Sequence, residues 1–195
     1  PQDFAHHMAK KNSRALWRQF LPDQREQEEQ GLHDPIGDQA QSPRSRIIHR
    51  YHNRALLTPS TFCPIDCRYC FRKNELNNTE DFLNGPINQA LNYIQDHPEI
   101  EEIILTGGDP LILSVQKLES LCLKIAQISH VKYLRFHSRT PIILPDRIDS
   151  EFIRLLNKLE KYFKRVSLVI HSNHPDELSD KLETNLQVLR QKTRV

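Results

Sequence analysis

The sequence lacks several features that define large classes of proteins. Its 195 residues contain four cysteines, too few for a scaffold held together by disulfides. The formal net charge is +2, so no excess of one sign points to nucleic acid or to an anionic membrane as a partner. No apolar run reaches the length of a membrane-spanning helix. Residues 1–7 lack the apolar stretch of a secretory signal, and we therefore expect the reducing cytoplasm as the location.

The chain divides into two parts by composition. Residues 1–46 are rich in Gln, Glu, Arg and Asp, and residues 13–21 are their best candidate for a helix. We interpret this part as a small helical cap with a linker, although its composition also allows a partly disordered arm. Residues 47–195 form the main domain. The chain starts with Pro1 and stops directly after a helical pattern, which suggests a piece of a longer protein that is truncated at its C-terminus.

Apolar or β-rich runs alternate with segments of helical period throughout the main domain. The runs cover residues 55–58, 102–106, 133–137 and 165–171. The helical segments after them contain residues 87–94, 114–126, 152–163 and 178–189, with Ser114 as a predicted N-cap. Four strand–helix units in a row predict an α/β fold with a parallel sheet. The pattern does not distinguish an open doubly wound sheet from a (β/α) barrel.

Polar clusters follow each of the four predicted strands. In either architecture, functional residues lie past the carboxyl ends of the strands. The clusters are the three cysteines of residues 63–70, the Gly-Gly-Asp-Pro of 107–110, the His-Ser-Arg-Thr-Pro of 137–141 and the His-Ser-Asn-His-Pro of 171–175. We expect all four clusters to meet on one rim of the sheet.

Three of the four cysteines lie within eight residues, at Cys63, Cys67 and Cys70. Thiolates this close together can surround one metal centre, whereas pairing as disulfides would leave one over. A 4Fe–4S cluster takes one ligand for each iron. Three cysteines therefore leave one iron open to a small molecule, as a catalytic cluster requires.

A zinc site and a chance grouping of inert thiols are the two other interpretations of these cysteines. Zinc sites commonly use two cysteine pairs that lie far apart in the sequence. No second pair exists here, so His171 or His174 would have to supply the fourth ligand. The remaining cysteine, Cys122, lies on the apolar face of a predicted helix, where we expect a small core residue.

The spacing C-x3-C-x2-C, with the aromatic Tyr69 before the last cysteine, resembles the signature of the radical S-adenosylmethionine (SAM) superfamily. Further blocks resemble its lysine 2,3-aminomutase family, in the same order and at compatible spacings across residues 42–180. They are His49-Arg50-Tyr51 with Arg54, then Arg72, Thr106-Gly107-Gly108-Asp109-Pro110, Ser138-Arg139-Thr140-Pro141 and Asn173-His174-Pro175. The resemblance implies a partial (β/α) barrel of the radical SAM type, of which this chain holds the first four strand–helix units.

The resemblance implies a 4Fe–4S cluster on the three cysteines, with SAM bound at the open iron. It places Tyr69 near the adenine and the backbone of Gly107 and Gly108 near the methionine amino group. It also makes Asp109, Ser138 and Arg139 candidate contacts of the SAM molecule. From the residues alone, an adjacent glycine pair equally suits a tight turn, and Asp109 equally suits a cap on the segment that follows it.

Pyridoxal 5′-phosphate is the second cofactor that the resemblance implies. Arg50, Tyr51 and Arg54 match a block near this cofactor, and the arginines suit its phosphate, although they also fit a solvated basic surface. Arg72 matches the arginine that binds the carboxylate of the amino-acid substrate, a task suited to a planar guanidinium. The family's Schiff-base lysine has no counterpart in residues 1–195, and the resemblance assigns none of these residues a catalytic role.

Three histidines near the predicted rim have two interpretations. They can line the site, or they can be ordinary structural histidines. They are His137, His171 and His174.

The implied enzyme is an isomerase, an intramolecular aminotransferase that cleaves SAM reductively and shifts the amino group of L-lysine from C2 to C3 to give β-lysine. One alternative is the related enzyme that makes β-lysine for elongation factor P, which His52-Asn53 and Cys70-Phe71-Arg72 slightly favour. Others are an enzyme for another amino acid and a non-catalytic zinc-binding module. We expect a small-molecule substrate, an electron donor such as flavodoxin or ferredoxin, and no nucleic acid or membrane. The oligomeric state stays open, a homo-oligomer being one outcome.

Overall fold

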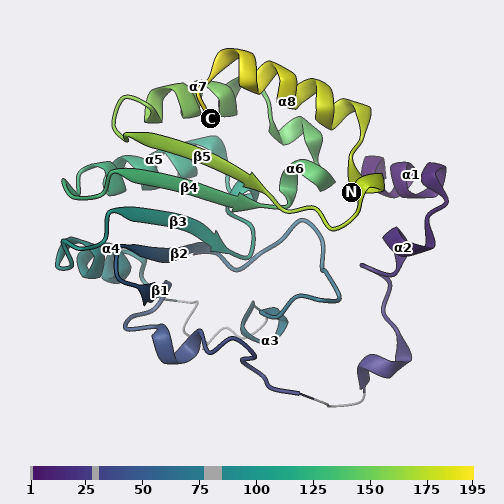
Figure 1. Ribbon diagram of the computed structural model, residues 1–195, viewed down its shortest axis with the longest axis horizontal. Coiled ribbons are helices and arrows are strands. Elements are labelled where there is room, and N and C mark those ends of the chain that lie inside the picture. The colour runs from purple at the N-terminus through teal and green to yellow at the C-terminus, as the bar shows by residue number, and fades with distance from the viewer. Residues whose placement is uncertain (1, 28–30, 77–84) are drawn as a thin grey trace.

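The computed structural model describes residues 2–27, 31–76 and 85–195 (Figure 1). Its centre is one curved five-stranded sheet in the order β1-β2-β3-β4-β5. The strands are β1 (Ile47–Tyr51), β2 (Arg54–Ser60), β3 (Glu102–Gly107), β4 (Tyr133–Ser138) and β5 (Arg165–Ile170). β1 runs antiparallel to β2, and the other neighbours are parallel.

Each parallel strand is followed by a helix that packs on the outer side of the curved sheet (Figure 1). These helices are α4 (Ile87–Gln95), α5 (Val115–Ala126), α7 (Ser150–Leu159) and α8 (Asp180–Lys192). Four strand–helix units around a sheet whose edge strands, β1 and β5, do not pair with each other make a partial barrel. The predicted α/β fold class is confirmed.

Alternation along the strands decides where the core lies, because successive side chains of a strand point to opposite faces. Leu105 and Phe136 are fully buried beneath the helices. Phe136 meets Phe152 of α7 edge to face, with ring centroids 6.2 Å apart. Cys122 of α5 is also fully buried, so its predicted place in the core is confirmed. The predicted N-cap at the start of α5 is confirmed as well, since the Ser114 hydroxyl accepts from the backbone N–H of Lys117 at 3.3 Å.

The sequence pattern missed the first strand, β1. Ile47 and Ile48 of this strand are fully buried, but the next residues are polar, so no alternation marks the strand. The chain reverses at residues 52–53 and pairs Tyr51 with Arg54 of β2. The block that holds Arg50 therefore lies on an edge strand, not in a loop before the sheet. The division of the chain at residue 46 stays a prediction.

The N-terminal part is only partly as predicted. The expected helix over residues 13–21 is reduced to α2 (Arg14–Trp17), and an unpredicted helix, α1 (Gln2–Lys11), precedes it. α1 buries Phe4 and Met8, one turn apart, which is too few apolar positions to give a visible period. Both helices lie on the side of the molecule toward which the carboxyl ends of β4 and β5 point (Figure 1).

Short elements complete the structure. They are α3 (Lys73–Leu76), α6 (Thr140–Ile143) and the 3₁₀ turns η1 (Gln24–Gln27), η2 (Gln39–Gln41), η3 (Pro110–Ile112), η4 (Pro145–Arg147) and η5 (Pro175–Glu177). Among the residues that the structure describes, no helix has the length and apolar character needed to span a bilayer.

Candidate functional site

A pocket of about 640 Å³ opens at the carboxyl ends of the parallel strands. Strand residues Leu56, Thr106 and His137 line it. They alternate with the core residues Leu57 and Leu105 and their neighbours, so they point to the inner side of the sheet, away from the helices. Residues from all four polar clusters line the same pocket. The predicted convergence on one rim is what the structure shows.

The three clustered cysteines, Cys63, Cys67 and Cys70, all line this pocket and are unpaired thiols. Burial, followed by the charge of Asp109, raises the pKa of Cys63 to about 12. Burial also raises the pKa values of Cys67 and Cys70. Without a metal these thiols hold their protons at neutral pH, so a metal that binds here has to displace those protons.

The chemistry of the donor set fits an iron–sulfur cluster. Such clusters take thiolate ligands, and three cysteine thiols line one pocket. Among the described residues, no three His, Cys, Asp or Glu side chains form a group that could hold a single metal ion.

Both glycines of the Gly107–Gly108 pair are required by the local packing. Gly107 has a φ of +106°, and a Cβ there would lie 2.1 Å from the side chain of Thr58. A Cβ on Gly108 would lie 2.4 Å from the carbonyl oxygen of Phe62, on the segment that enters the cysteine loop. The Gly108 N–H donates to the Ser60 carbonyl at 2.9 Å. The pair thus lets two loops of the rim pack backbone to backbone.

Asp109 joins the end of β3 to the end of β4. Its carboxylate accepts from the Ser138 hydroxyl at 2.7 Å and from the backbone N–H groups of Leu111, Arg139 and Thr140 at 3.0, 2.7 and 2.9 Å. Protein donors thus occupy the carboxylate, in agreement with the capping alternative. Asp109 and Ser138 border the pocket, and their contact with SAM stays a prediction.

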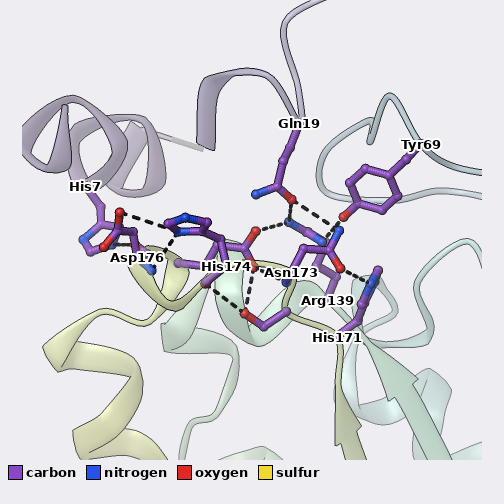
Figure 2. Close-up of polar contacts among 10 residues, drawn as sticks. His7, Gln19, Tyr69, Arg139, His171, Asn173, His174 and Asp176 are labelled. Atoms are coloured by element: carbon purple, nitrogen blue, oxygen red, sulfur yellow. Dashed lines mark hydrogen bonds and ion pairs between the residues drawn. The ribbon is translucent and has the colours of Figure 1, made fainter. Parts of the chain in front are cut away.

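Arg139 is the centre of a network that Figure 2 shows. Its Nη1 donates to the hydroxyl of Tyr69. Its Nη2 donates to Glu177 at 2.7 Å and to the side-chain oxygen of Gln19 at 3.0 Å. Asn173 holds the same Glu177 through its backbone N–H at 3.0 Å. The network connects the cysteine loop, the loops after β4 and β5, and the N-terminal part.

Burial and neighbouring charges shift the pKa values of two residues in this network. Burial alone would raise the pKa of Glu177, but the Arg139 guanidinium and the hydrogen bonds around the carboxylate outweigh it and lower the pKa. For Tyr69, burial and then the neighbouring Cys67 thiol raise the pKa. Glu177 is therefore a carboxylate and Tyr69 a neutral phenol at neutral pH.

The residues assigned to pyridoxal phosphate and to the substrate are only partly brought together. Arg50, Tyr51 and Arg72 line the pocket, whereas Arg54 does not. Arg54 pairs with Tyr51 across β1 and β2, and its Nη1 stands 4.0 Å from the carboxylate of Glu102. Its assigned contact with the cofactor phosphate stays a prediction.

The three rim histidines differ in their environment. His137 and His171 line the pocket, and Nε2 of His137 is buried with no hydrogen-bond partner among the described residues. Burial, and then the neighbouring Arg135, lowers the pKa of His137. His174 instead caps η5, where its Nδ1 accepts from the backbone N–H of Asp176 at 3.2 Å. It is a structural histidine.

Three site residues were missed by sequence reasoning. Asp38 lines the pocket, and Gln19 and Glu177 belong to the Arg139 network. Asp38 sits in a segment with Pro35 and Gly37, two residue types that are typical of turns. Gln19 and Glu177 belong to no motif in the sequence, so neither stood out before the fold placed it.

The comparisons with known proteins agree with this geometry. The model of the radical SAM superfamily matches residues 57–193. The chain is 36% identical over 159 residues to L-lysine 2,3-aminomutase of Clostridium subterminale, covering 81% of this chain and 37% of that protein. It is 36% identical over 164 residues to the enzyme of the same name from Fusobacterium nucleatum, covering 84% and 38%. With that from Escherichia coli the identity is 35% over 157 residues, covering 80% and 45%.

The chain thus spans less than half the length of these relatives. The resemblance to lysine 2,3-aminomutases that the motifs indicated is confirmed. The names of these relatives state the amino acid on which they act. A substrate for this chain has to be argued from the residues of its own site.

Proposed function

Because this chain belongs to the radical SAM superfamily, we propose that it is the cluster-bearing part of an aminomutase that shifts the amino group of L-lysine from C2 to C3. The observation that carries the proposal is the shared pocket. The cysteine loop brings the three cysteines, Tyr69 and Arg72 to it, and the end of β3 brings the glycine pair. The superfamily implies SAM and a 4Fe–4S cluster, and pyridoxal phosphate is part of the proposal.

In this proposal Cys63, Cys67 and Cys70 hold the cluster. When bound, the cluster and SAM supply a one-electron cleavage that yields a radical able to remove a hydrogen atom, and pyridoxal phosphate supplies a carrier for the migrating amino group. The chain's residues bind and orient these groups. Their placement, and not proton transfer by a side chain, is the contribution of this part of the protein.

The cysteine loop and the loop after β3 are held in register by their backbones. The Asp109 N–H donates to the Phe62 carbonyl at 2.8 Å, next to Cys63. Tyr69, fixed by Arg139, presents its ring to the pocket, where it can pack against a nucleoside base. His171 meets that ring edge to face at 5.9 Å. These contacts set the distance between the metal ligands and the proposed SAM site.

Two arginines bring positive charge to the pocket. Arg50 and Arg72 line it together with Tyr51, and guanidinium groups suit the carboxylate of an amino acid and the phosphate of a cofactor. Nε of Arg72 is buried without a hydrogen-bond partner in the described part of the chain. Such a donor is costly unless a ligand satisfies it. An amino-acid substrate with its carboxylate at Arg72 would do so.

The metal content of the full-length protein tests the first part of the proposal. After anaerobic reconstitution we expect about four irons and four sulfides per chain, and loss of both in Cys67→Ala. Cys122→Ala removes a thiol in the core, away from the pocket, and is the matched control that should keep the iron. One zinc ion without sulfide would instead support the zinc-binding module.

Product analysis tests the second part. With SAM, a reductant and pyridoxal phosphate, the full-length protein should form 5′-deoxyadenosine and convert L-lysine to β-lysine. Conversion of another amino acid in place of lysine would keep the radical enzyme and replace the substrate. Comparing free lysine with the intact elongation factor P system separates the two β-lysine-producing alternatives. The electron donor, the oligomeric state and the cytoplasmic location stay predictions.

A further inference from the structure

A buried carboxylate in the linker, Asp38, connects two arginines of the pocket. It is only 3% exposed, although aspartate is rarely buried unless it is paired. It follows Gly37, whose φ of +72° is a conformation that glycine adopts readily. The backbone N–H groups of Asp38 and Gln39 donate to the carboxylate of Asp34 at 3.0 and 2.9 Å. The linker therefore fixes the position of Asp38.

The two carboxylate oxygens of Asp38 accept from different arginines. Oδ1 accepts from Nη2 of Arg50 at 3.1 Å, and Oδ2 accepts from Nη2 of Arg72 at 2.6 Å. Arg50 belongs to β1 and Arg72 follows the last clustered cysteine, so one side chain joins three segments. It also places a negative charge between two guanidinium groups that would otherwise repel each other.

Both arginines keep donors for a ligand. Asp38 occupies one nitrogen of Arg72, whose buried Nε has no hydrogen-bond partner among the described residues. The Arg72 guanidinium stacks on the ring of Phe71, 5.0 Å from its centroid, which further restricts its orientation. The side chain of Arg50 is 35% exposed and borders the pocket. The trio carries one net positive charge, which suits an anionic group.

We propose that Asp38 is a positioning residue for an anion site formed by Arg50 and Arg72. It does not touch the ligand. It holds the two guanidinium groups so that their remaining N–H groups face a carboxylate or phosphate group in the pocket. This inference rests on the proposed function, which supplies two such anions, the substrate carboxylate and the phosphate of pyridoxal phosphate.

Equilibrium binding to the full-length protein without its cluster tests the role of Asp38. The probes are L-lysine, followed by calorimetry, and pyridoxal phosphate, followed by its absorbance. Asp38→Asn keeps the size of the side chain, but its amide nitrogen donates and therefore no longer accepts from the second arginine. We expect dissociation constants at least about tenfold larger. An effect on lysine alone assigns the site to the carboxylate, and an effect on the cofactor alone assigns it to the phosphate.

Two further variants separate positioning from general damage. Asp38→Glu keeps the charge and should recover most of the lost affinity. Asp3→Asn breaks an exposed ion pair with Lys181 in the N-terminal part and should bind both probes as the wild type does. If Asp38→Asn fails to fold, as judged by circular dichroism, Asp34→Ala replaces it. That change frees the backbone of Asp38 without removing its charge and should weaken binding in the same direction.

Unchanged or tighter binding of both probes by Asp38→Asn would overturn the inference, because Asp38 would then be neutral or a competitor for the arginines. Where Asp34→Ala has to be used, unchanged binding of both probes by that variant would overturn the inference as well. A wild-type protein that binds neither probe would instead overturn the proposed use of lysine and pyridoxal phosphate. If the wild type binds both probes and Asp38→Asn binds them equally well, the proposed function is kept and only the role of Asp38 is rejected.

Discussion

At the scale of single residues, the site depends on positions where the surrounding atoms leave no room for a larger residue or hold a charge out of water. Gly108 meets the backbone of Phe62 so closely that no larger residue fits. Glu177 is fully buried and faces Arg139, which is 7% exposed. Both residues can affect the site without touching a ligand. Gly108 allows the segment at Phe62 to pack against the end of β3, and Glu177 holds Arg139, which lines the pocket.

Gly108→Ala should destabilise the fold by about 1–3 kcal/mol, because the new Cβ forces the segment that enters the cysteine loop to move. Chemical denaturation measures the change. Gly37→Ala is the control for an added methyl group, since a Cβ there meets nothing within 4 Å. It should cost about 1 kcal/mol for its positive φ alone. Equal stability of Gly108→Ala and the wild type would contradict the packing argument.

Glu177→Ala should destabilise the protein by about 3–5 kcal/mol, because it leaves the buried Arg139 guanidinium without its counter-charge. The free energy of unfolding in denaturant is the measurement. Glu151→Ala, which removes an exposed carboxylate 3.9 Å from Arg154, is the control and should change it by less than about 0.5 kcal/mol. A loss as small as that of the control would mean that the buried pair stabilises little.

At the scale of elements, the N-terminal part holds the cysteine loop from outside the sheet. The backbone N–H of Arg68 donates to the Gln19 carbonyl at 2.9 Å. The Arg68 side chain donates to the Arg18 carbonyl at 2.7 Å and pairs with Glu26. At the other end of the loop, Asp38 holds Arg72. The cap and linker are therefore part of the site.

Arg68→Ala should loosen the cysteine loop while changing global stability by less than about 1 kcal/mol, since Arg68 is partly exposed. In the metal-free protein, the reaction of Cys67 and Cys70 with a disulfide reagent should become about fivefold faster. This corresponds to about 1 kcal/mol of local opening. Arg25→Ala, at the exposed pair with Asp23, should leave the rates unchanged. Equal rates in the two variants would show that Arg68 does not hold the loop.

At the scale of the whole molecule, the site joins all parts of the chain, so its ion pairs also contribute to folding. Glu177 has a lowered pKa relative to its ordinary value of 4.5. A group with a lowered pKa in the folded state stabilises fully above its ordinary pKa, and this contribution disappears as the pH falls through the folded value.

Stability should therefore decrease as the pH falls below about 4.5, and part of this decrease should be absent in Glu177→Gln. The free energy of unfolding measured at several acidic pH values, and at neutral pH, checks this. The difference between wild type and variant should be largest at neutral pH and should shrink on acidification. A difference that stays constant with pH would exclude a titrating Glu177 as its source.

The sequence alone determined the four strand–helix units and pointed to the cysteine loop. Alternating apolar and helical periods predicted the four strand–helix units, because burial of one face imposes that period. The spacing of Cys63, Cys67 and Cys70 predicted a metal site, because chain-local ligands need no fold to be close. The expected meeting of the polar clusters followed from the common direction of parallel strands.

Only the tertiary structure decided which distant residues complete the site. Gln19, Asp38 and Glu177 carry no local pattern, since their roles arise from contacts across 12 to 120 positions of sequence. The fold likewise left Arg54 out of the pocket lining while its strand partner Tyr51 belongs to it, a difference that a motif does not show. Periodicity and local spacing can be read along a chain, whereas partners brought together by folding depend on how its elements pack.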